Sequence, residues 1–350
     1  MPEKTRRFFI SDVHLGGELS HAWFQSALHE APLLAFFEYV AAQHDVKDLV
    51  LLGDFFDHWM FPMNEKPPPL PELILQRYPK VVEAVKQARK AVDNVFYVNG
   101  NHDMHVNQAD LDKVFGTGVA TWIPQYNGGL LYAEHGSRFA MFNARDKLHD
   151  PTDGFPLGYF ITRLLASSDK EYDRPGSVMT YIDDLLEAAF TTSSLAESVI
   201  EALAELTGKH PNDTFEMPGA RQKISIAQVQ KKYAPLFQRW SEKFGPRYAM
   251  QAIMGEMGSL GWFADRLCKQ NGYRVVVLGH THASEVDEDS LFLAQGRVYA
   301  NAGYWCPKPH SKRKDDHATF VEVDKHAGKL VVRLWAHDSG KLQTRKEVSV

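Results

Sequence analysis

Residues 48–57 read DLVLLGDFFD, a short apolar run that ends at a glycine and is followed by two acidic residues. The apolar run predicts a buried strand, and the glycine permits a sharp turn directly after it. Similar runs occur at Arg7–Ser11 and Val95–Val98, and two segments with helical spacing of apolar residues, 32–43 and 79–92, lie between them. Because strands alternate with helices, the first half of the chain predicts an α/β layered fold.

The middle of the chain has a different pattern. Residues 150–272 are mainly helical, with long amphipathic runs at 181–206, 224–240 and 248–269. Pro and Gly residues separate these runs, as expected for breaks between helices. We therefore expect this segment to form a helical insert or cap.

Strand patterns return after the helical segment. The first is an apolar run at Tyr273–Leu278. Four further short runs predict a set of antiparallel strands at 291–294, 297–301, 319–323 and 330–336.

The composition is that of an ordinary globular protein, with 44% hydrophobic and 24% charged residues among 350. The net charge of -5 provides no broad basic field, which argues weakly against nucleic-acid binding. Two cysteines do not suggest a disulfide framework, so a reducing compartment is expected. We see no secretory signal and no apolar run long enough to cross a bilayer, and we expect a cytoplasmic location. The apolar stretch 155–161 leaves a peripheral membrane contact open.

Polar motifs follow the predicted strands, at the point where each strand ends. Ligands in open α/β sheets bind outside the carboxyl ends of the strands, so these motifs can meet at one edge. A further His follows the apolar run at 130–133. The motifs are Asp12-Val13-His14, Gly53-Asp54-Phe55-Phe56-Asp57, Gly100-Asn101-His102-Asp103, Glu134-His135-Gly136 and Gly279-His280-Thr281-His282.

The residue types in these motifs suit divalent metal ions. Carboxylate, amide oxygen and imidazole together favour Mn, Fe or Zn, and suit Mg less well. Asp54 is a natural bridging ligand, because a carboxylate has two oxygens and can neutralise two cations.

In this order, DVH, GDFFD, GNHD, HG and GHTH resemble the calcineurin-like metallophosphoesterase family. The resemblance covers both ends of the chain but not the helical middle. It implies a four-layer α-β-β-α sandwich whose catalytic domain comprises residues 1–149 and 273–350, with residues 150–272 as the insert. It also implies site roles. Asp12, His14 and His282 would bind one metal, Asn101, His135 and His280 the other, and Asp54 would bridge them. His102 would face the substrate, oriented by Asp103.

The implied chemistry is hydrolysis of a phosphoester or pyrophosphate bond. Two cations roughly 3.5–4 Å apart can hold a bridging hydroxide that attacks phosphorus in line. His102 would stabilise the phosphoryl oxygens or protonate the leaving group. We expect Mn in particular, and a small-molecule phosphoester or nucleotide-linked substrate.

The substrate class stays open at this level. The stretch 53–59, GDFFDHW, resembles the UDP-2,3-diacylglucosamine hydrolase branch of the family, whose members cleave a pyrophosphate bond. A phosphodiesterase or nuclease and a phosphoprotein phosphatase are alternatives within the enzyme class. A metal-binding scaffold without activity is the alternative outside it, and the complete set of proposed ligands argues against that reading. The sequence gives no indication of oligomeric state.

Overall fold

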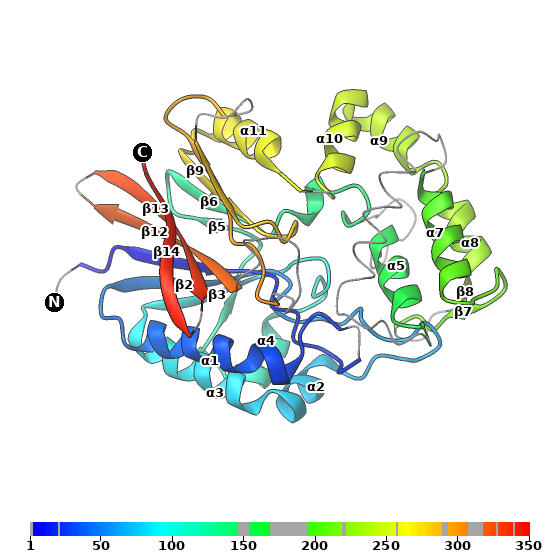
Figure 1. Cartoon of the computed structure of the whole chain (residues 1–350), viewed down its shortest axis with the longest axis horizontal. Helices are drawn as coiled ribbons and strands as arrows, with labels where there is room; N and C mark the ends of the chain where they lie inside the picture. Colours follow the sequence, from blue (N-terminus) through cyan, green and yellow to red (C-terminus); the bar gives the residue numbers. More distant parts are fainter. Residues whose placement is uncertain are drawn as a thin grey trace.

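The computed structural model describes residues 3–19, 22–145, 154–168, 195–218, 222–256, 258–288, 293–306, 318–326, 328–338 and 340–350. Within these ranges two β-sheets lie face to face, with helices outside them (Figure 1). The helices between residues 157 and 254 gather beyond one end of the sheets, at the right of Figure 1.

The larger sheet has seven strands in the order β14-β13-β12-β1-β2-β3-β4. Strands β1 to β4 are parallel to their neighbours, and β12 joins β1 in the antiparallel sense. The C-terminal strands therefore extend a parallel sheet at one side. Their bounds are β1 Arg6–Ile10, β2 Val46–Leu52, β3 Asn94–Val98, β4 Thr121–Trp122, β12 Ala318–His326, β13 Lys329–Asp338 and β14 Lys341–Ser349.

The smaller sheet has five strands in the order β10-β11-β9-β6-β5. Its three central strands are parallel, and an antiparallel strand lies at each edge. The bounds are β5 Tyr126–Asn127, β6 Leu131–Ala133, β9 Val275–Leu278, β10 Glu285–Glu288 and β11 Val298–Asn301.

Apolar side chains from both sheets form one core between them. Phe9 and Val50 of the larger sheet belong to the same buried cluster as Val277 and Ala300 of the smaller one. On the outer face of the larger sheet lie α1 Ser26–Ala41, α2 Leu70–Arg77, α3 Pro79–Ala91 and α4 Gln108–Phe115. Helix α11, Gly261–Asn271, covers the smaller sheet. The layers are thus helix, sheet, sheet, helix, which confirms the predicted fold class.

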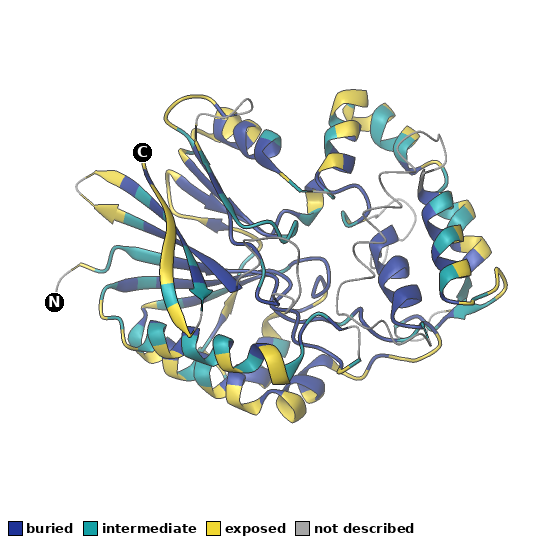
Figure 2. Ribbon diagram, viewed as in Figure 1, coloured by how far each residue is buried: buried dark blue, intermediate teal, exposed yellow. Residues whose placement is uncertain are grey.

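The middle segment packs against the loops that follow the strands. Trp59 and Met63 share a buried cluster with Phe155 and Leu164. Helix α5 is buried along its whole length, as Figure 2 shows, whereas the helices around it have exposed outer faces. The elements of the middle segment here are α5 Leu157–Leu165, α7 Leu195–Leu206, β7 Thr214–Phe215, β8 Ile224–Ser225, α8 Ile226–Tyr233, α9 Leu236–Phe244 and α10 Pro246–Met254, and the short helix η1 Ser137–Phe139 precedes them.

Several helix predictions differ from the structure. The run at 224–240 divides into β8, α8 and α9, because Pro235 has no N–H to continue the first helix. The run at 248–269 divides into α10 and α11, which are separated by residues 255–260. Of the helix expected at 181–206, residues 181–194 lie outside the described ranges, and α7 occupies the remainder. Helices α2 and α4 were not expected.

Two strand predictions also differ. Strand β11 pairs in parallel with β9, so the strands after β9 are not all antiparallel. Leu293 and Ala294 are not in a strand, and residues 291 and 292 lie outside the described part of the chain. Strand direction depends on which strands become neighbours, and a local pattern does not contain that information. None of the described helices is long and apolar enough to cross a membrane.

Arg163 connects helix α5 to the loop after the second motif. Its side chain is fully buried. Nη1 donates to the Tyr159 hydroxyl at 2.6 Å, and Nη2 donates to the Pro62 carbonyl oxygen at 2.7 Å and to the carbonyl of Glu65. Burial lowers the pKa of this guanidinium. One buried side chain therefore joins the helical middle to the loop after the second motif through hydrogen bonds to backbone carbonyl oxygens.

Replacing this side chain tests the connection. Arg163→Met should lower the free energy of unfolding by on the order of 2–4 kcal/mol, because the hydrogen bonds that a fully buried guanidinium makes to the Tyr159 hydroxyl and to the Pro62 and Glu65 carbonyls are lost together. Urea denaturation followed by circular dichroism measures the change. The control is Arg345→Met, which removes an ion pair to Asp338 between partly exposed side chains. Equal, small effects of both substitutions would contradict this role for Arg163.

Candidate metal centre

Five strands from the two sheets end at the same place, and each is followed by a residue that can bind a metal. The second residue after β1, β2, β6 and β9 is Asp12, Asp54, His135 and His280, respectively, and the third residue after β3 is Asn101. These strands are parallel within each sheet. Their carboxyl ends therefore bring side chains that are far apart in the sequence into one cluster.

The first group of side chains is formed by Asp12, His14 and His282. The Nε2 atoms of the two imidazoles face each other at 3.2 Å. His282 Nε2 is 3.2 Å from Asp12 Oδ1, and His14 Nε2 is 3.9 Å from the same oxygen. Three atoms with lone pairs thus converge on one point.

The second group lies beside the first and contains Asp54, His135 and His280. His135 Nε2 is 3.2 Å from Asp54 Oδ2 and 3.2 Å from Asn101 Oδ1. His135 Nδ1 is 3.1 Å from the Leu52 carbonyl oxygen, to which it can donate. With its proton on Nδ1, the ring presents an unprotonated Nε2 to the group, as a metal ligand must.

Asp54 lies between the two groups. Its Oδ2 is 3.2 Å from His135 Nε2 in the second group and 4.0 Å from His14 Nε2 in the first. Its Oδ1 accepts a hydrogen bond from the backbone N–H of His102 at 2.8 Å. The carboxylate is therefore held in a position from which it can neutralise two cations.

The backbone at this site is held in an unfavourable conformation. In the described ranges, five residues other than glycine have positive φ angles between 47° and 73°. All five belong to the predicted ligand set. This left-handed conformation costs roughly 1–2 kcal/mol for an L-residue, and such strain concentrates at functional sites. The five residues with positive φ angles are Asp12, His14, Asp54, His280 and His282.

The electrostatics of the two groups favour bound cations. Burial alone would raise the pKa of Asp54, but the neighbouring His135 and His102 hold it well below its usual range. Burial lowers the pKa of His135, and Asp54 with Asp12 overcomes this effect and raises it to about 10. The pKa of His282 is lowered to about 4, chiefly by burial. Buried carboxylates that stabilise a protonated imidazole can stabilise a metal ion in place of the proton.

A buried acceptor supports the same conclusion. Asp12 Oδ1 has no hydrogen-bond donor with adequate geometry among the described residues, although imidazole nitrogens lie 3.2–3.9 Å away. Buried carboxylate oxygens without partners are costly unless an ion compensates them. The donor set of carboxylate, amide and imidazole groups fits divalent metal ions.

His102 lies next to the two groups, but its partner differs from the prediction. His102 Nδ1 is 3.0 Å from Asp57 Oδ1, and the Trp59 ring stacks on the imidazole with centroids 4.5 Å apart. Burial lowers the pKa of His102, and Asp57 with Asp54 overcomes this effect and raises it to about 9. Asp57 therefore orients the ring.

The expectation that Asp103 orients His102 is wrong. Asp103 Oδ2 accepts from the Tyr97 hydroxyl at 2.5 Å and from the Phe55 N–H at 3.0 Å, and Oδ1 accepts from the Gly100 N–H at 2.6 Å. Both carboxylate oxygens are thus used to hold the two motif loops together. Consecutive side chains leave the chain in different directions, so adjacency in the sequence did not place Asp103 beside its neighbour's ring.

The structure brings together all seven residues predicted as ligands, with His102 beside them. Asp57 and Trp59 both lie in the quoted stretch 53–59, but the sequence did not indicate that either side chain contacts His102. The signal for Asp57 was present in the motif, since a second acid follows Asp54 by three residues.

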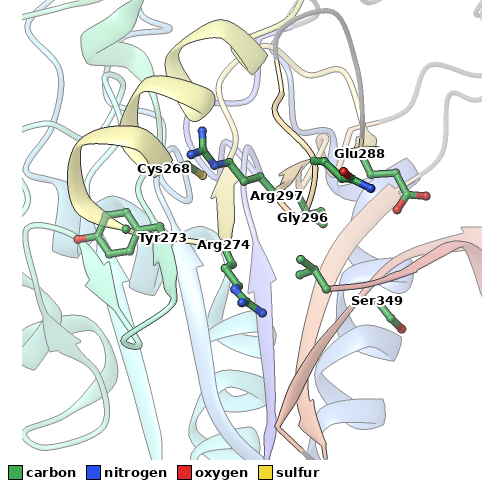
Figure 3. A pocket seen from close by; sticks show the side chains of 11 residues that line it. Cys268, Tyr273, Arg274, Glu288, Gly296, Arg297 and Ser349 are labelled. Atoms are coloured by element: carbon green, nitrogen blue, oxygen red, sulfur yellow. The ribbon is translucent and has the colours of Figure 1, made fainter.

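A separate pocket of about 610 Å³ lies at the opposite ends of strands β9 and β11 (Figure 3). Its lining includes Tyr273 and Arg274 before β9 and Arg297 before β11. None of the predicted ligands lines it. We therefore place the candidate chemistry only at the carboxyl ends of the strands.

The comparisons with known proteins identify a family. A family model described as calcineurin-like phosphoesterase matches residues 5–284. A search of curated proteins found no match.

Solved structures with similarity to this chain include a single mutant of Vps29 from Entamoeba histolytica, at 10% identity, with 99% of each chain covered and a TM-score of 0.36. A predicted phosphoesterase from Streptococcus pneumoniae has 9% identity, covers 99% of this chain and 98% of its own, and has a TM-score of 0.32. The calcineurin-like phosphoesterase YfkN from Bacillus subtilis has 9% identity, 99% and 89% coverage, and a TM-score of 0.30.

A glycine substitution tests the position of Asp54. A Cβ atom at Gly100 would overlap the side chain and the backbone nitrogen of Asp54. Gly100→Ala should therefore weaken Mn²⁺ binding by at least about tenfold, measured by equilibrium dialysis, because ligand positions tolerate little displacement. Gly258→Ala, where a Cβ meets no atom within 4 Å, is the control. Equal metal binding by both variants would contradict the arrangement.

Proposed function

The chain belongs to the calcineurin-like phosphoesterase family, and on this premise we propose that it is a hydrolase that cleaves a phosphoester or pyrophosphate bond with two divalent metal ions. The observation that carries the proposal is the pair of adjacent Asp/His groups joined by Asp54. Mn is the proposed metal, with Fe or Zn as alternatives, because the donor set combines carboxylate and amide oxygens, which suit Mn, with imidazole nitrogens, which suit Fe and Zn.

Each group of side chains has a proposed task. Asp12, His14 and His282 hold one ion, Asn101, His135 and His280 hold the other, and Asp54 contacts both. Bound there, the ions would supply a water of lowered pKa as nucleophile and neutralise charge on the phosphoryl oxygens. The strained backbone of five of these residues supports a role in binding, since selection for stability alone would not retain it.

His102 is the proposed proton donor to the leaving group. Asp57 engages Nδ1, so Nε2 is the nitrogen left to face a substrate. Stacking on Trp59 restricts rotation of the ring. A carboxylate behind an imidazole fixes its orientation and stabilises its protonated form.

The organic part of the substrate has a proposed place. A cavity of about 770 Å³ reaches from Asn101 and His135 to helix α9 of the middle segment. This size is within the range of pockets that hold small-molecule ligands. Residues 150–272 would thus act as a cap over a catalytic domain at 1–149 and 273–350. The proposed setting is cytoplasmic.

The cavity lining combines positive charge with apolar surface. Its basic residues are Arg138, Arg145, Arg239 and Lys243, against one acid in the described lining, Glu134, which pairs with Arg138 at 2.6 Å. Arg145 is exposed, and its Nη2 donates a hydrogen bond to the Met104 carbonyl oxygen at 3.0 Å. Aromatic side chains of the lining include Trp122, Trp240 and Phe244. The combination suits a small substrate with a second anionic group and an apolar or aromatic part.

A nucleotide-linked pyrophosphate fits this description, and the UDP-2,3-diacylglucosamine hydrolase branch is the specific candidate. Incubation of the Mn-loaded protein with UDP-2,3-diacylglucosamine should release UMP. If no UMP appears, this branch is excluded. Hydrolysis of bis-p-nitrophenyl phosphate without UMP release would instead favour a phosphodiesterase, and a preference for phosphopeptides a protein phosphatase.

Two substitutions separate metal binding from proton donation. Asp54→Ala should abolish hydrolysis and reduce metal content, because both groups lose their shared carboxylate. His102→Ala should lower kcat by about 10²–10⁴-fold and leave both metals bound. Elemental analysis with steady-state kinetics measures both effects. A His102→Ala protein that lost a metal would show that His102 is a ligand.

Arg145 and Trp240 test the cavity. Arg145→Met and Trp240→Ala should raise KM for a substrate that fills the cavity, by about tenfold each, because a charged hydrogen bond or an aromatic contact is lost. Turnover of bis-p-nitrophenyl phosphate should change little. The control is Lys231→Met, since Lys231 is exposed and does not line the cavity. If KM for both substrates were unchanged, the cavity would not hold the substrate.

A further inference from the structure

Three side chains connect the middle segment to the second group of candidate ligands. Asn101 Nδ2 donates to Asn143 Oδ1 at 3.1 Å, and Asn143 Nδ2 donates to Glu256 Oε2 at 2.7 Å. Glu256 Oε1 accepts from the backbone N–H of Phe142. The Glu256 side chain is 5% exposed, so this carboxylate is held almost entirely within the protein.

The order of donors and acceptors in this relay is fixed at one end. A carboxylate only accepts hydrogen bonds, so Asn143 must direct its NH₂ toward Glu256. The Asn143 oxygen then points toward Asn101, and the Asn101 NH₂ must donate the hydrogen bond to it. The remaining atom of that amide, Oδ1, is left facing His135 Nε2 at 3.2 Å. If the amide turned over, two acceptors or two donors would face each other at some point in the relay.

A glycine of helix α5 makes room for this relay. The Gly158 N–H donates to the Phe142 carbonyl oxygen at 2.7 Å, and a Cβ atom at this position would overlap Asn143 Oδ1. Asn143 thus lies between α5 on one side and Glu256, the second residue after α10, on the other. Both enclosing segments belong to the middle of the chain.

Glu256 also lies near a second member of the same group. Its Oε2 is 3.8 Å from His280 Nε2. Partners behind the ligands orient them and commonly change metal affinity by about 10–100-fold when they are removed. At this distance the carboxylate makes no hydrogen bond to His280, so its one direct side-chain link toward this group of ligands in the described part of the chain runs through Asn143.

We propose that Glu256, acting through Asn143, is a positioning residue that holds the Asn101 amide with its oxygen toward the metal. The middle segment then completes the metal centre in addition to covering it. This inference rests on the proposed function, because it assumes that Asn101 binds an ion.

The experiment is a double-mutant cycle read out by metal binding. Mn²⁺ binding to wild type, Glu256→Gln, Asn143→Leu and the double variant is measured by equilibrium dialysis and titration calorimetry. Each single variant should bind one of two ions about 10–100-fold more weakly and the other ion unchanged. The double variant should resemble Asn143→Leu, because the relay is already broken there. Circular dichroism confirms that each variant is folded.

Two further variants sharpen the result. Gly158→Ala should also weaken the binding of one ion, because the added Cβ would displace the Asn143 side chain. Alanine is the better helix former, so helix propensity alone predicts no such loss. Glu242→Gln on α9, an exposed glutamate that pairs with Gln238 at 2.8 Å, should bind both ions as wild type does.

The outcomes separate this inference from the proposed function. Two ions bound equally by wild type and Glu256→Gln would overturn the relay alone. A Glu256→Gln effect that persists in full in the Asn143→Leu background would also overturn it, because Glu256 would then act directly. A wild-type protein that binds no Mn²⁺ would overturn the proposed function and this inference together.

Discussion

The site depends on one buried carboxylate that must satisfy groups from two sheets. Asp54 follows a strand of the larger sheet, yet its nearest imidazole partner, His135, follows a strand of the smaller one. The two sheets must therefore pack with their carboxyl ends aligned. The shared apolar core between the sheets fixes that alignment, because sliding one sheet would expose side chains from both.

Hydrogen bonds between the motif loops, including one to the same carboxylate, offset part of the backbone strain at this site. Left-handed backbone at five residues and the burial of several carboxylates both oppose folding. Hydrogen bonds from motif loops, such as that from the His102 N–H to Asp54, offset part of this cost. Asp103 contributes by accepting from Tyr97, Phe55 and Gly100, so its task is to hold the loops in place. Binding of cations would offset the rest of this cost to folding.

The helical middle packs directly against residues around the candidate site. It shares an apolar core with Trp59, whose ring stacks on His102, and Arg163 joins it to the loop after the second motif. Its helices also form one wall of the cavity that reaches His135. A change in how this segment packs would therefore alter the shape of this cavity and the position of the His102 ring together.

The sequence by itself determined the layered α/β fold, the strand ends and which side chains make up the candidate metal centre. Those features are local, since apolar runs, glycines and ligand types lie next to one another in the chain. Only the tertiary structure decided that Asp57 and not Asp103 contacts His102, that β11 runs parallel to β9, and that Glu256 reaches Asn101 through Asn143. The physical reason is that these contacts depend on side-chain direction and on the packing of distant segments. A local sequence pattern contains neither kind of information.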